Sequence, residues 1–193
     1  KIIRRYHFTF EGKRKYKRKS TLTRLRNRYA PKVSAPGFVQ VDSIILHMDG
    51  ERYRFVSVID IFTKMAYVLL VHRLLAENAV TAFHHFQAMF PFPIHTVQTD
   101  NGSEFLGEFH QDLEKQKITH LFIYPHSPRI NGVVERFNRT VQQEFLTRST
   151  ELHVDQQAFR VKLEQYLHWY NTVRPHAALQ YRAPQQVIDQ IPK

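Results

Sequence analysis

The stretch GFVQVDSIILHMDGERYRFVSVIDIF, residues 37–62, decides the fold that the sequence predicts. Both of its halves are rich in Val, Ile and Phe, which is typical of strands. Asp49–Gly50 lies between them, and an Asp-Gly pair between two apolar runs is a strong hairpin signal. The segment KMAYVLLVH, residues 64–72, is a third run of the same kind. The sequence therefore predicts a hairpin followed by a further strand.

The rest of the chain alternates between helix and strand signals. After the third strand, the predicted elements are a helix over 77–90, a strand over 94–100, a helix over 103–117, a strand over 118–125, a helix from about 131, and a helix over 154–171. This order predicts an α/β fold, in which helices flank a mixed five-stranded sheet.

Basic residues are concentrated at the N-terminus. Residues 1–36 hold 13 of the 28 lysines and arginines and a single acid, Glu11. The sequence therefore predicts a basic DNA-binding arm or linker over 1–36, and a nearly neutral globular part with a C-terminal helical extension over 37–193. A basic arm usually attracts nucleic acid, and the alternative is a solvated tail. The densest run predicts DNA contacts by Lys13, Arg14, Lys15, Lys17, Arg18 and Lys19.

Composition excludes several classes of protein. Without cysteine, the chain has no disulfide and no thiolate metal site, which fits a reducing, cytoplasmic location. No apolar run approaches about 18 residues, so we expect no membrane span. P-loop and Gly-x-Ser-x-Gly signatures are absent, and the 12 histidines show no metal-ligand spacing. Because the first residue is Lys rather than Met, the sequence can be a piece of a longer protein.

Two aspartates are notable for where they lie on the predicted strands. Asp42 is in the middle of the first strand among apolar residues, where a buried acid without a partner is costly. Asp100 ends a strand just before Asn101, and the carboxyl ends of strands in open sheets border crevices where reactive groups gather. The alternative for Asp100 is a role in a turn or a helix cap.

A third acid, Glu135, lies on the helix that starts near residue 131. At about 100° per residue, a polar stripe borders the apolar stripe of this helix. The polar stripe comprises Glu135, Asn138, Arg139 and Gln142. We expect the last three to contact DNA, with Arg129 in the preceding loop as a further candidate. The alternative is a surface glutamate that pairs with Arg139 four positions later.

Three acids brought together by a fold would repel one another and would need a cation. Ligation by oxygen alone favours Mg²⁺ or Mn²⁺ over zinc. Two such ions, about 3.5–4 Å apart, suit phosphodiester chemistry, in which one activates the attacking oxygen and the other stabilises the leaving oxygen.

Four ordered segments resemble the catalytic core of retroviral-integrase-like DDE transposases, especially those of bacterial insertion sequences. They are FVQVDSI around Asp42, VQTDNGSEF around Asp100, YPHSPRINGVVERFNRT around Glu135, and YNTVRPHAALQYRAP near the C-terminus. The resemblance covers residues 38–184. It implies an RNase H-like fold with the three acids as the catalytic, metal-binding triad. Thirty-four residues separate Asp100 from Glu135, one fewer than in many family members, which indicates a change in the loop near 125–129.

The resemblance implies a DNA transposase or integrase that cleaves at transposon 3′ ends and transfers the freed 3′-OH into target DNA, with two Mg²⁺ or Mn²⁺ ions per active site. It also implies double-stranded DNA as partner, a homo-oligomer on paired ends, an accessory ATPase as an optional partner, and a prokaryotic, nucleoid-associated location. Two alternatives stay open. One is a catalytically silent DNA-binding or assembly subunit, and the other is an RNase H-type hydrolase, a class that usually needs four acids.

Four further positions have both a structural and a functional interpretation. Asn101 either orients Asp100 or forms the turn after it. Asp60 either supports the acids or caps a strand end, and the cap is favoured. Glu104 either approaches the acids or favours a helix start by its charge. The segment 174–176, Arg-Pro-His, is interpreted as a clamp onto the core, with DNA or subunit contact as the alternative.

Overall fold

One mixed sheet of six strands organises the molecule. A computed structural model describes residues 25–27, 29–124 and 128–192. The strands are β1 (Leu25–Asn27), β2 (Phe38–Met48), β3 (Glu51–Asp60), β4 (Ala66–Val71), β5 (Thr96–Thr99) and β6 (Thr119–Ile123), in the spatial order β1-β6-β5-β2-β3-β4. Neighbours among β2, β3 and β4 pair antiparallel, whereas β5 pairs parallel with both β2 and β6. The predicted hairpin and mixed sheet are confirmed.

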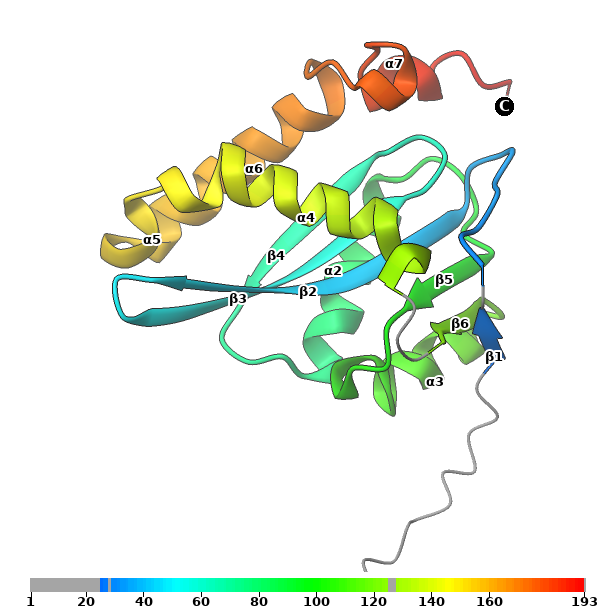
Figure 1. Ribbon diagram of the computed structural model, residues 1–193, viewed down its shortest axis with the longest axis horizontal. Coiled ribbons are helices and arrows are strands. Elements are labelled where there is room, and N and C mark those ends of the chain that lie inside the picture. The colour runs from blue at the N-terminus through cyan, green and yellow to red at the C-terminus, as the bar shows by residue number, and fades with distance from the viewer. Residues whose placement is uncertain (1–24, 28, 125–127, 193) are drawn as a thin grey trace, which may run out of the picture.

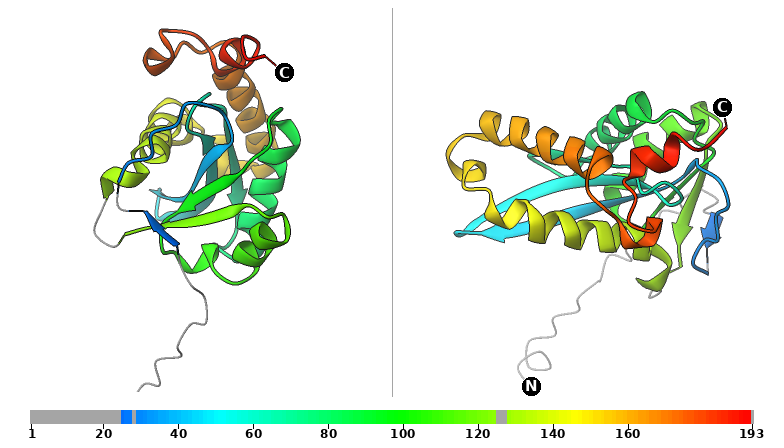
Figure 2. Two further views of the ribbon diagram at one scale, coloured as in Figure 1. Left: turned by 90° about the vertical axis from the view of Figure 1, so that its right-hand side faces the viewer. Right: turned by 90° about the horizontal axis from the view of Figure 1, so that it is seen from above.

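Helices cover both faces of this sheet (Figure 1, Figure 2). The α-helices are α2 (Ala76–Met89), α3 (Glu108–Lys115), α4 (Gly132–Glu144), α5 (Glu151–Val154), α6 (Gln156–Thr172) and α7 (Pro184–Ile188), with 3-10 turns η1 (Ser103–Phe105), η2 (Pro128–Asn131), η3 (Leu146–Arg148) and η4 (Ala177–Leu179). α2 and α3 lie on one face, and α4 and α6 lie on the other. The predicted α/β layers are therefore confirmed.

Alternation along the strands divides the hydrophobic core into two parts. On β2, Val39 and Val41 pack on the side of α2 and α3. Ile44 faces the other side, where it belongs to the same cluster as Val134 of α4. Because successive side chains of a strand point to opposite faces, Asp42 points to the α4 face, two positions before Ile44.

The sequence predicts five strands, and the sixth, β1, comes from the end of the basic arm. β1 pairs parallel with β6, with Leu25 opposite Leu121. The prediction missed it because β1 has only three residues, Leu-Arg-Asn, and two of them are exposed. Such a segment shows no alternation of apolar and polar side chains. Its pairing comes instead from the open edge that β6 offers.

The helix predicted over 103–117 is interrupted. η1 ends at Phe105, and α3 begins only after Gly107, which has a φ of 57°. This left-handed conformation suits glycine because it lacks a Cβ. Phe105 and Phe109, on either side, are both fully buried. Both aromatic residues lie in helical segments, as predicted, but Gly107 separates these segments.

Asp60 caps the end of β3, as the favoured interpretation predicted. Its Oδ1 accepts hydrogen bonds from the N–H and the hydroxyl of Thr63, at 2.6 and 2.7 Å. Its Oδ2 accepts from the N–H of Gly37 at 2.9 Å. These three bonds compensate for the burial of Asp60, so its carboxylate is fully engaged in holding the turn after β3 against the start of β2.

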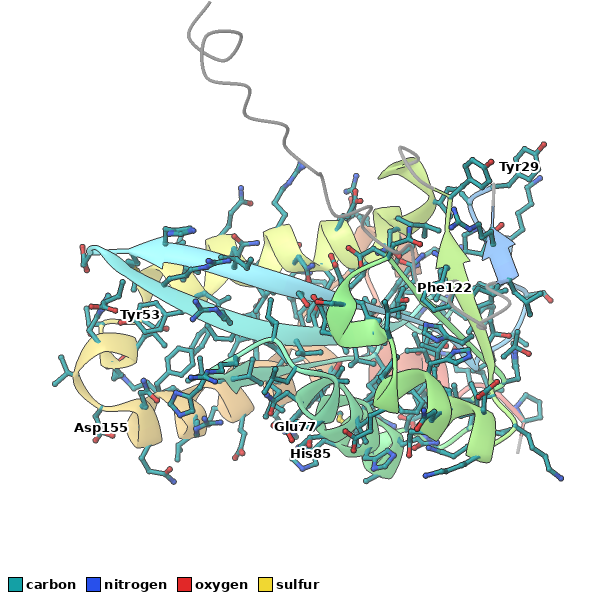
Figure 3. All side chains as sticks on the ribbon, turned by 90° about the horizontal axis from the view of Figure 1, so that it is seen from below. Tyr29, Tyr53, Glu77, His85, Phe122 and Asp155 are labelled. Atoms are coloured by element: carbon teal, nitrogen blue, oxygen red, sulfur yellow. The ribbon has the colours of Figure 1, made fainter. Side chains whose placement is uncertain are left out.

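The two ends of the layered structure are tied by side chains. At the hairpin end, the hydroxyl of Tyr53 lies 2.6 Å from Nδ1 of His153 on α5 (Figure 3). At the other end, the Asn171 side chain on α6 makes two 2.9 Å hydrogen bonds to the backbone of Ala66 on β4. α6 is therefore fixed across the length of the sheet. No helix in the described ranges is long and apolar enough to cross a bilayer.

Candidate active site

Strand register places Asp42 beside Asp100. β2 and β5 run parallel, with Gln40 opposite Gln98. Extending this register by two positions sets Asp42 at the level of Asp100, just beyond the end of β5. Neighbouring strands lie about 4.8 Å apart. The fold thus makes neighbours of two acids that are 58 positions apart in the sequence.

Two buried glutamines fix the start of α4 above these aspartates. Gln40 Nε2 donates to the carbonyl of Ile130 at 3.0 Å, and Gln40 Oε1 accepts from the N–H of Val134 at 3.0 Å. Gln98 Nε2 donates to the same Ile130 carbonyl at 3.1 Å. Both glutamines are fully buried. They therefore orient the first turn of α4, which carries Glu135.

Glu135 and Asp42 line one surface cavity, which we name the carboxylate pocket. Its volume is about 500 Å³, and Asn138, Arg139 and Gln142 also line it. The polar stripe predicted from the sequence therefore faces the strand acid across a single cavity. Glu135 is exposed. Among the ion pairs of the described side chains, none joins Glu135 to Arg139, so the alternative of a simple surface pair is not supported.

The Asp42 carboxyl group is held in an unfavourable environment. Its pKa is raised to about 7, first by burial and then by the charges of Asp100, Glu135 and Glu104, against an opposing hydrogen bond from the Ser43 backbone. The other three carboxyl groups therefore lie close enough to Asp42 to influence its ionisation. A cation among them would favour the ionised form instead.

Asn138 extends this group and leaves one atom unsatisfied. Its Nδ2 donates to Asp42 Oδ2 at 2.8 Å. The residue is only 7% exposed, and its Oδ1 is buried without a hydrogen-bond partner among the described residues. An unpaired buried acceptor is costly, so this oxygen is suited to a donor on a ligand or a water molecule. A phosphate oxygen, which only accepts, does not suit it.

A fourth carboxylate, that of Glu104, lies near Asp42 and Asp100. Ser43 Oγ donates to Glu104 Oε1 at 2.7 Å. A Cβ on Gly102 would lie 2.7 Å from Glu104 Oε2 and 2.9 Å from Asp100 Oδ1, so a larger residue there would displace one of the two carboxylates. Of the two interpretations of Glu104, the geometry supports its approach to the acids.

The turn after β5 is closed by Asp100 and Asn101. Asp100 Oδ1 accepts from the N–H of Gly102 at 2.7 Å, and Asn101 Nδ2 donates to the carbonyl of Ile123 at 3.0 Å. Burial raises the pKa of Asp100, the Gly102 hydrogen bond lowers it, and the charge of Glu104 raises it. These contacts support the turn-forming interpretation of Asn101. They also hold Asp100 at the end of β5 beside β2.

The chemistry of these donors fits Mg²⁺ or Mn²⁺. Asp42, Asp100 and Glu135 would hold the ions through carboxylate oxygens, the ligands that such hard cations prefer. The pKa of Asp42 is raised first by burial and then by the charges of three neighbouring acids, which a bound cation would offset. In the part of the chain that the structure describes, no three acidic or histidine side chains are close enough to ligate one ion as they stand.

The predicted DNA-contacting residues divide into two groups. Arg139 is exposed at the carboxylate pocket, and Gln142 is half-buried there, with its Nε2 donating to the Asn138 carbonyl at 3.1 Å. The side chain of Arg129 lies outside the described residues, as do Lys13, Arg14, Lys15, Lys17, Arg18, Lys19 and the loop over 125–127. DNA contact stays a prediction for all of them.

Sequence reasoning missed Gln40 and Gln98. A signal was present, because each is a glutamine inside an otherwise apolar strand and stands two positions before an acid. A buried amide must find hydrogen-bond partners. What the sequence could not reveal is that both would use the backbone at the start of α4.

Comparisons with known proteins point to the same resemblance as the motifs. A family model described as "Integrase core domain" matches residues 116–184, which include Glu135 and the C-terminal motif. The "Putative integrase ORF3" of Spiroplasma virus SpV1-C74 is 28% identical over 151 residues, which cover 69% of this chain and 41% of that protein. The "Insertion element IS407 uncharacterized 31.7 kDa protein" of Burkholderia multivorans is 29% identical, over 72% of this chain and 50% of that protein. The chain thus spans half or less of the length of these relatives.

Solved structures share the fold. The HTLV-2 integrase catalytic core domain in complex with magnesium superposes with a TM-score of 0.62 at 19% identity, over 79% of this chain and 96% of that one. A chain of the simian T-cell lymphotropic virus intasome in complex with PP2A regulatory subunit B56 gamma gives a TM-score of 0.71 at 19% identity, over 90% of this chain and 61% of that one. This chain therefore has the RNase H-like fold of integrase catalytic cores.

The motifs, the sequence matches and the fold agree on one class of protein. The chain is similar to retroviral-integrase-like transposase catalytic cores in its motifs, its sequence matches and its fold, which agrees with the resemblance drawn from the sequence.

Proposed function

We propose that this chain catalyses metal-dependent cleavage at the 3′ ends of a mobile DNA element and transfers the freed 3′-OH into target DNA. The observation that carries the proposal is the place of Asp42, which the strand register sets beside Asp100 and which shares the carboxylate pocket with Glu135. Burial and the neighbouring acids together raise the pKa of Asp42 to about 7. Such a group of acids suits Mg²⁺ or Mn²⁺ and phosphodiester chemistry.

The reaction is the same displacement carried out twice. In the first, a water oxygen attacks the phosphorus at the element end, and the 3′ oxygen leaves and takes up a proton. In the second, that 3′-OH attacks a phosphorus of the target strand, and the target 3′ oxygen leaves. Because both steps act on a phosphodiester and release a 3′-OH, one set of carboxylates serves both without a covalent protein–DNA intermediate.

In this proposal, each residue of the site has its own role. Asp42, Asp100 and Glu135 would hold two Mg²⁺ ions, which would supply activation of the attacking oxygen and stabilisation of the leaving one. Asn138 holds the Asp42 carboxylate through a 2.8 Å hydrogen bond. Arg139, exposed at the carboxylate pocket, binds a phosphate of the DNA strand and so positions it.

Partners follow from the same proposal. Double-stranded DNA is the substrate, and the basic arm over 1–36 adds contacts to its backbone. A homo-oligomer holds two DNA ends together. The similarity to a chain of an intasome and to a core domain in a form described as dimeric supports such an assembly. An accessory ATPase and a nucleoid-associated, prokaryotic location stay predictions from the resemblance.

An RNase H-type hydrolase is the second candidate, because Glu104 supplies a fourth acid. The charge of Glu104 raises the pKa of Asp42 and of Asp100, so the number of acids no longer argues against this class. The matches to integrase and insertion-element proteins favour the transposase. A silent DNA-binding subunit is disfavoured because all three acids of the motif are present.

The experiment is Mn²⁺- or Mg²⁺-dependent nicking of supercoiled plasmid DNA, with Glu135→Gln beside the wild type. Glu77→Gln is the matched control, because Glu77 is an exposed glutamate on α2, on the opposite face of the sheet (Figure 3). We expect nicking by the wild type and by the control only, with 3′-OH ends that a polymerase can extend. Joined strands among the products separate a transposase from a hydrolase. Equal nicking by Glu135→Gln would contradict the proposal.

A further inference from the structure

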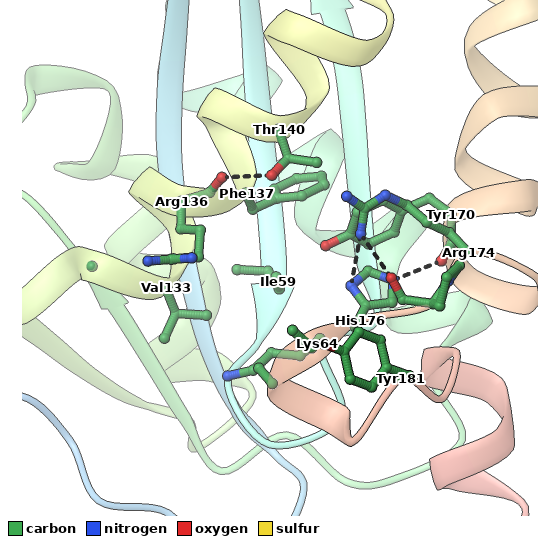
Figure 4. A pocket seen from close by; sticks show the side chains of 14 residues that line it. Ile59, Lys64, Val133, Arg136, Phe137, Thr140, Tyr170, Arg174, His176 and Tyr181 are labelled. Carbon is green, nitrogen blue, oxygen red and sulfur yellow. Dashed lines mark hydrogen bonds between the residues drawn. The ribbon is translucent and has the colours of Figure 1, made fainter.

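A second cavity lies on the other side of α4, which we name the C-terminal pocket (Figure 4). Its volume is about 530 Å³, and it lies between the N-terminal half of α4 and the segment that follows α6. Val133, Arg136, Phe137 and Thr140 line it from α4. None of these residues lines the carboxylate pocket, so the two cavities lie on different sides of the same helix.

Hydrogen bonds fix the outer wall of the C-terminal pocket. Arg174 Nε donates to Glu144 Oε2 of α4 at 2.9 Å. His176 Nε2 lies 3.1 Å from the Tyr170 carbonyl, and its backbone N–H donates to Arg182 at 3.2 Å. The chain after α6 is therefore clamped to α4 and α6, as the structural interpretation of the Arg-Pro-His segment predicted. The cavity is built by these contacts rather than left between loose segments.

Two cations line this pocket without a carboxylate partner. Arg136 is exposed, and Lys64 reaches in from the turn before β4 (Figure 4). Neither belongs to an ion pair among the described residues, whereas Arg174 is neutralised by Glu144. Burial lowers the pKa of Lys64, and the nearby charge of Asp60 raises it. Asp60 is itself engaged by the turn that it caps, and Lys64 Nζ donates one hydrogen bond, to the Ile61 carbonyl.

An aromatic ring completes the pocket. Tyr181 lines it and is 76% exposed. It follows Gln180, and both residues have a positive φ, of 56° at Gln180 and 63° at Tyr181. Non-glycine residues rarely adopt this conformation, so the surrounding contacts must hold the turn. One is the hydrogen bond of 2.9 Å from the Tyr181 N–H to the His176 carbonyl. The ring is thus presented on a constrained turn beside two cations.

We propose that the C-terminal pocket binds a phosphate and the adjoining base of a DNA strand that crosses α4 beside the cleavage site. Lys64 and Arg136 take the phosphate, and the base stacks on Tyr181. Arg136 directly follows Glu135 in the sequence, so a strand that leaves the carboxylate pocket over the exposed side of α4 reaches this pocket next. The inference rests on the proposed function, because it assumes that DNA lies at Glu135.

The alternative occupant is a segment of a second copy of the chain. The basic arm is a poor candidate, because residues 1–36 carry 13 lysines and arginines and the pocket is itself cationic. Charge complementarity therefore favours DNA over this part of a second copy.

The test measures the affinity of fluorescein-labelled single-stranded and duplex DNA by fluorescence anisotropy, in EDTA and at several salt concentrations. The variants are Arg136→Ala and Tyr181→Ala, both at exposed side chains. Arg73→Ala is the control, because Arg73 is an exposed arginine just beyond the end of β4 and does not line this pocket. Sedimentation velocity on the same samples reports the oligomeric state.

We expect each pocket variant to weaken DNA binding by about 5-fold or more, and the control by less than 2-fold. Arg136→Ala should also reduce the slope of log affinity against log salt by about one. Unchanged DNA affinity in both variants would overturn the inference, as would a changed oligomeric state with unchanged affinity. DNA binding is measured without metal. If the nicking experiment fails, the anisotropy result therefore still tests whether the C-terminal pocket contacts DNA.

Discussion

At the level of single residues, one short pattern occurs twice: a glutamine followed two positions later by an aspartate. Gln40 and Asp42 lie on β2, and Gln98 and Asp100 lie on β5 and at its end. Side chains two positions apart share a strand face, so each pattern presents an amide and a carboxyl group to α4. The amides position the helix, and the Asp42 carboxyl group shares the carboxylate pocket with the helix's glutamate, Glu135.

Replacement of Asp42 should stabilise the metal-free protein. Asp42→Asn removes a repelled carboxyl group and keeps an oxygen that can accept from Asn138. The folded-state pKa of about 7 exceeds the unfolded value near 3.8, so the wild type loses stability as the pH rises from about 4 to about 7. At pH 8 in EDTA we expect a gain of about 1–3 kcal/mol in the free energy of unfolding, which vanishes near pH 4. Urea unfolding at both pH values measures it, and a loss at pH 8 would contradict it.

Replacement of Gln40 should loosen α4 from the sheet. Gln40→Leu leaves the buried N–H of Val134 without its 3.0 Å acceptor. An unpaired buried donor costs about 1–3 kcal/mol, and Glu135 loses its fixed position. We expect this loss of unfolding free energy together with weaker metal-dependent nicking. Gln157→Leu, at an exposed glutamine on α6, is the control. The positioning role is refuted if Gln40→Leu nicks like the control.

At the level of secondary-structure elements, the sequence predicted the parts with strong periodicity and missed the short ones. β2, β3 and α4 were predicted because alternation and helical spacing extend over ten or more residues. β1 and α7 were missed because three and five residues are too few to show a period. The motifs predicted Asp42, Asp100 and Glu135 as a triad. The hydrogen bonds from Gln40 and Gln98 to the start of α4 were missed, because they join segments that are distant in the sequence.

A buried histidine pair between α3 and β6 should make stability depend on pH. His120 Nδ1 lies 2.9 Å from Nδ1 of His110, and His120 Nε2 lies 2.9 Å from the Thr99 hydroxyl. Burial, and then the charge of His110, lowers the pKa of His120 to about 3. Because the unfolded state binds this proton first, the stability that neutral His120 contributes is complete above about pH 6.5 and is lost as the pH falls towards 3.

The raised pKa of Asp42 gives the opposite trend, a loss of stability as the pH rises. The contribution of His120 is therefore measured as the difference in unfolding free energy between the wild type and His120→Gln. Relative to the variant, the wild type should lose about 1–2 kcal/mol of unfolding free energy between pH 8 and pH 5. Urea unfolding of both proteins at the two pH values gives the difference. A constant difference between them would show that His120 does not titrate in this way.

At the level of the whole molecule, a nearly neutral catalytic core is joined to a strongly basic arm. Among the described residues of the arm, those of β1 are part of the sheet. The two pockets lie on opposite sides of α4, so this helix is the centre of the proposed DNA path. The net charge of +11 comes almost entirely from residues 1–36, so the proposal assigns attraction of DNA to the arm and the chemistry to the core.

Neutralising the arm should weaken DNA binding without changing the fold. Changing Lys13, Arg14, Lys15, Lys17, Arg18 and Lys19 to glutamine removes six positive charges. We expect weaker binding to any DNA sequence, with the slope of log affinity against log salt reduced by up to about five. Fluorescence anisotropy measures the slope, and circular dichroism controls for folding. An unchanged slope would exclude the arm from DNA contact.

The central claim is that acids from two strands and a helix gather to hold a divalent cation. Calorimetric titration of Mn²⁺ into the wild type, Asp100→Asn, Glu135→Gln and the control Glu77→Gln tests it most directly. We predict binding by the wild type and the control, and affinity at least about 10-fold weaker in both triad variants. Equal Mn²⁺ affinity in all four proteins would contradict the claim.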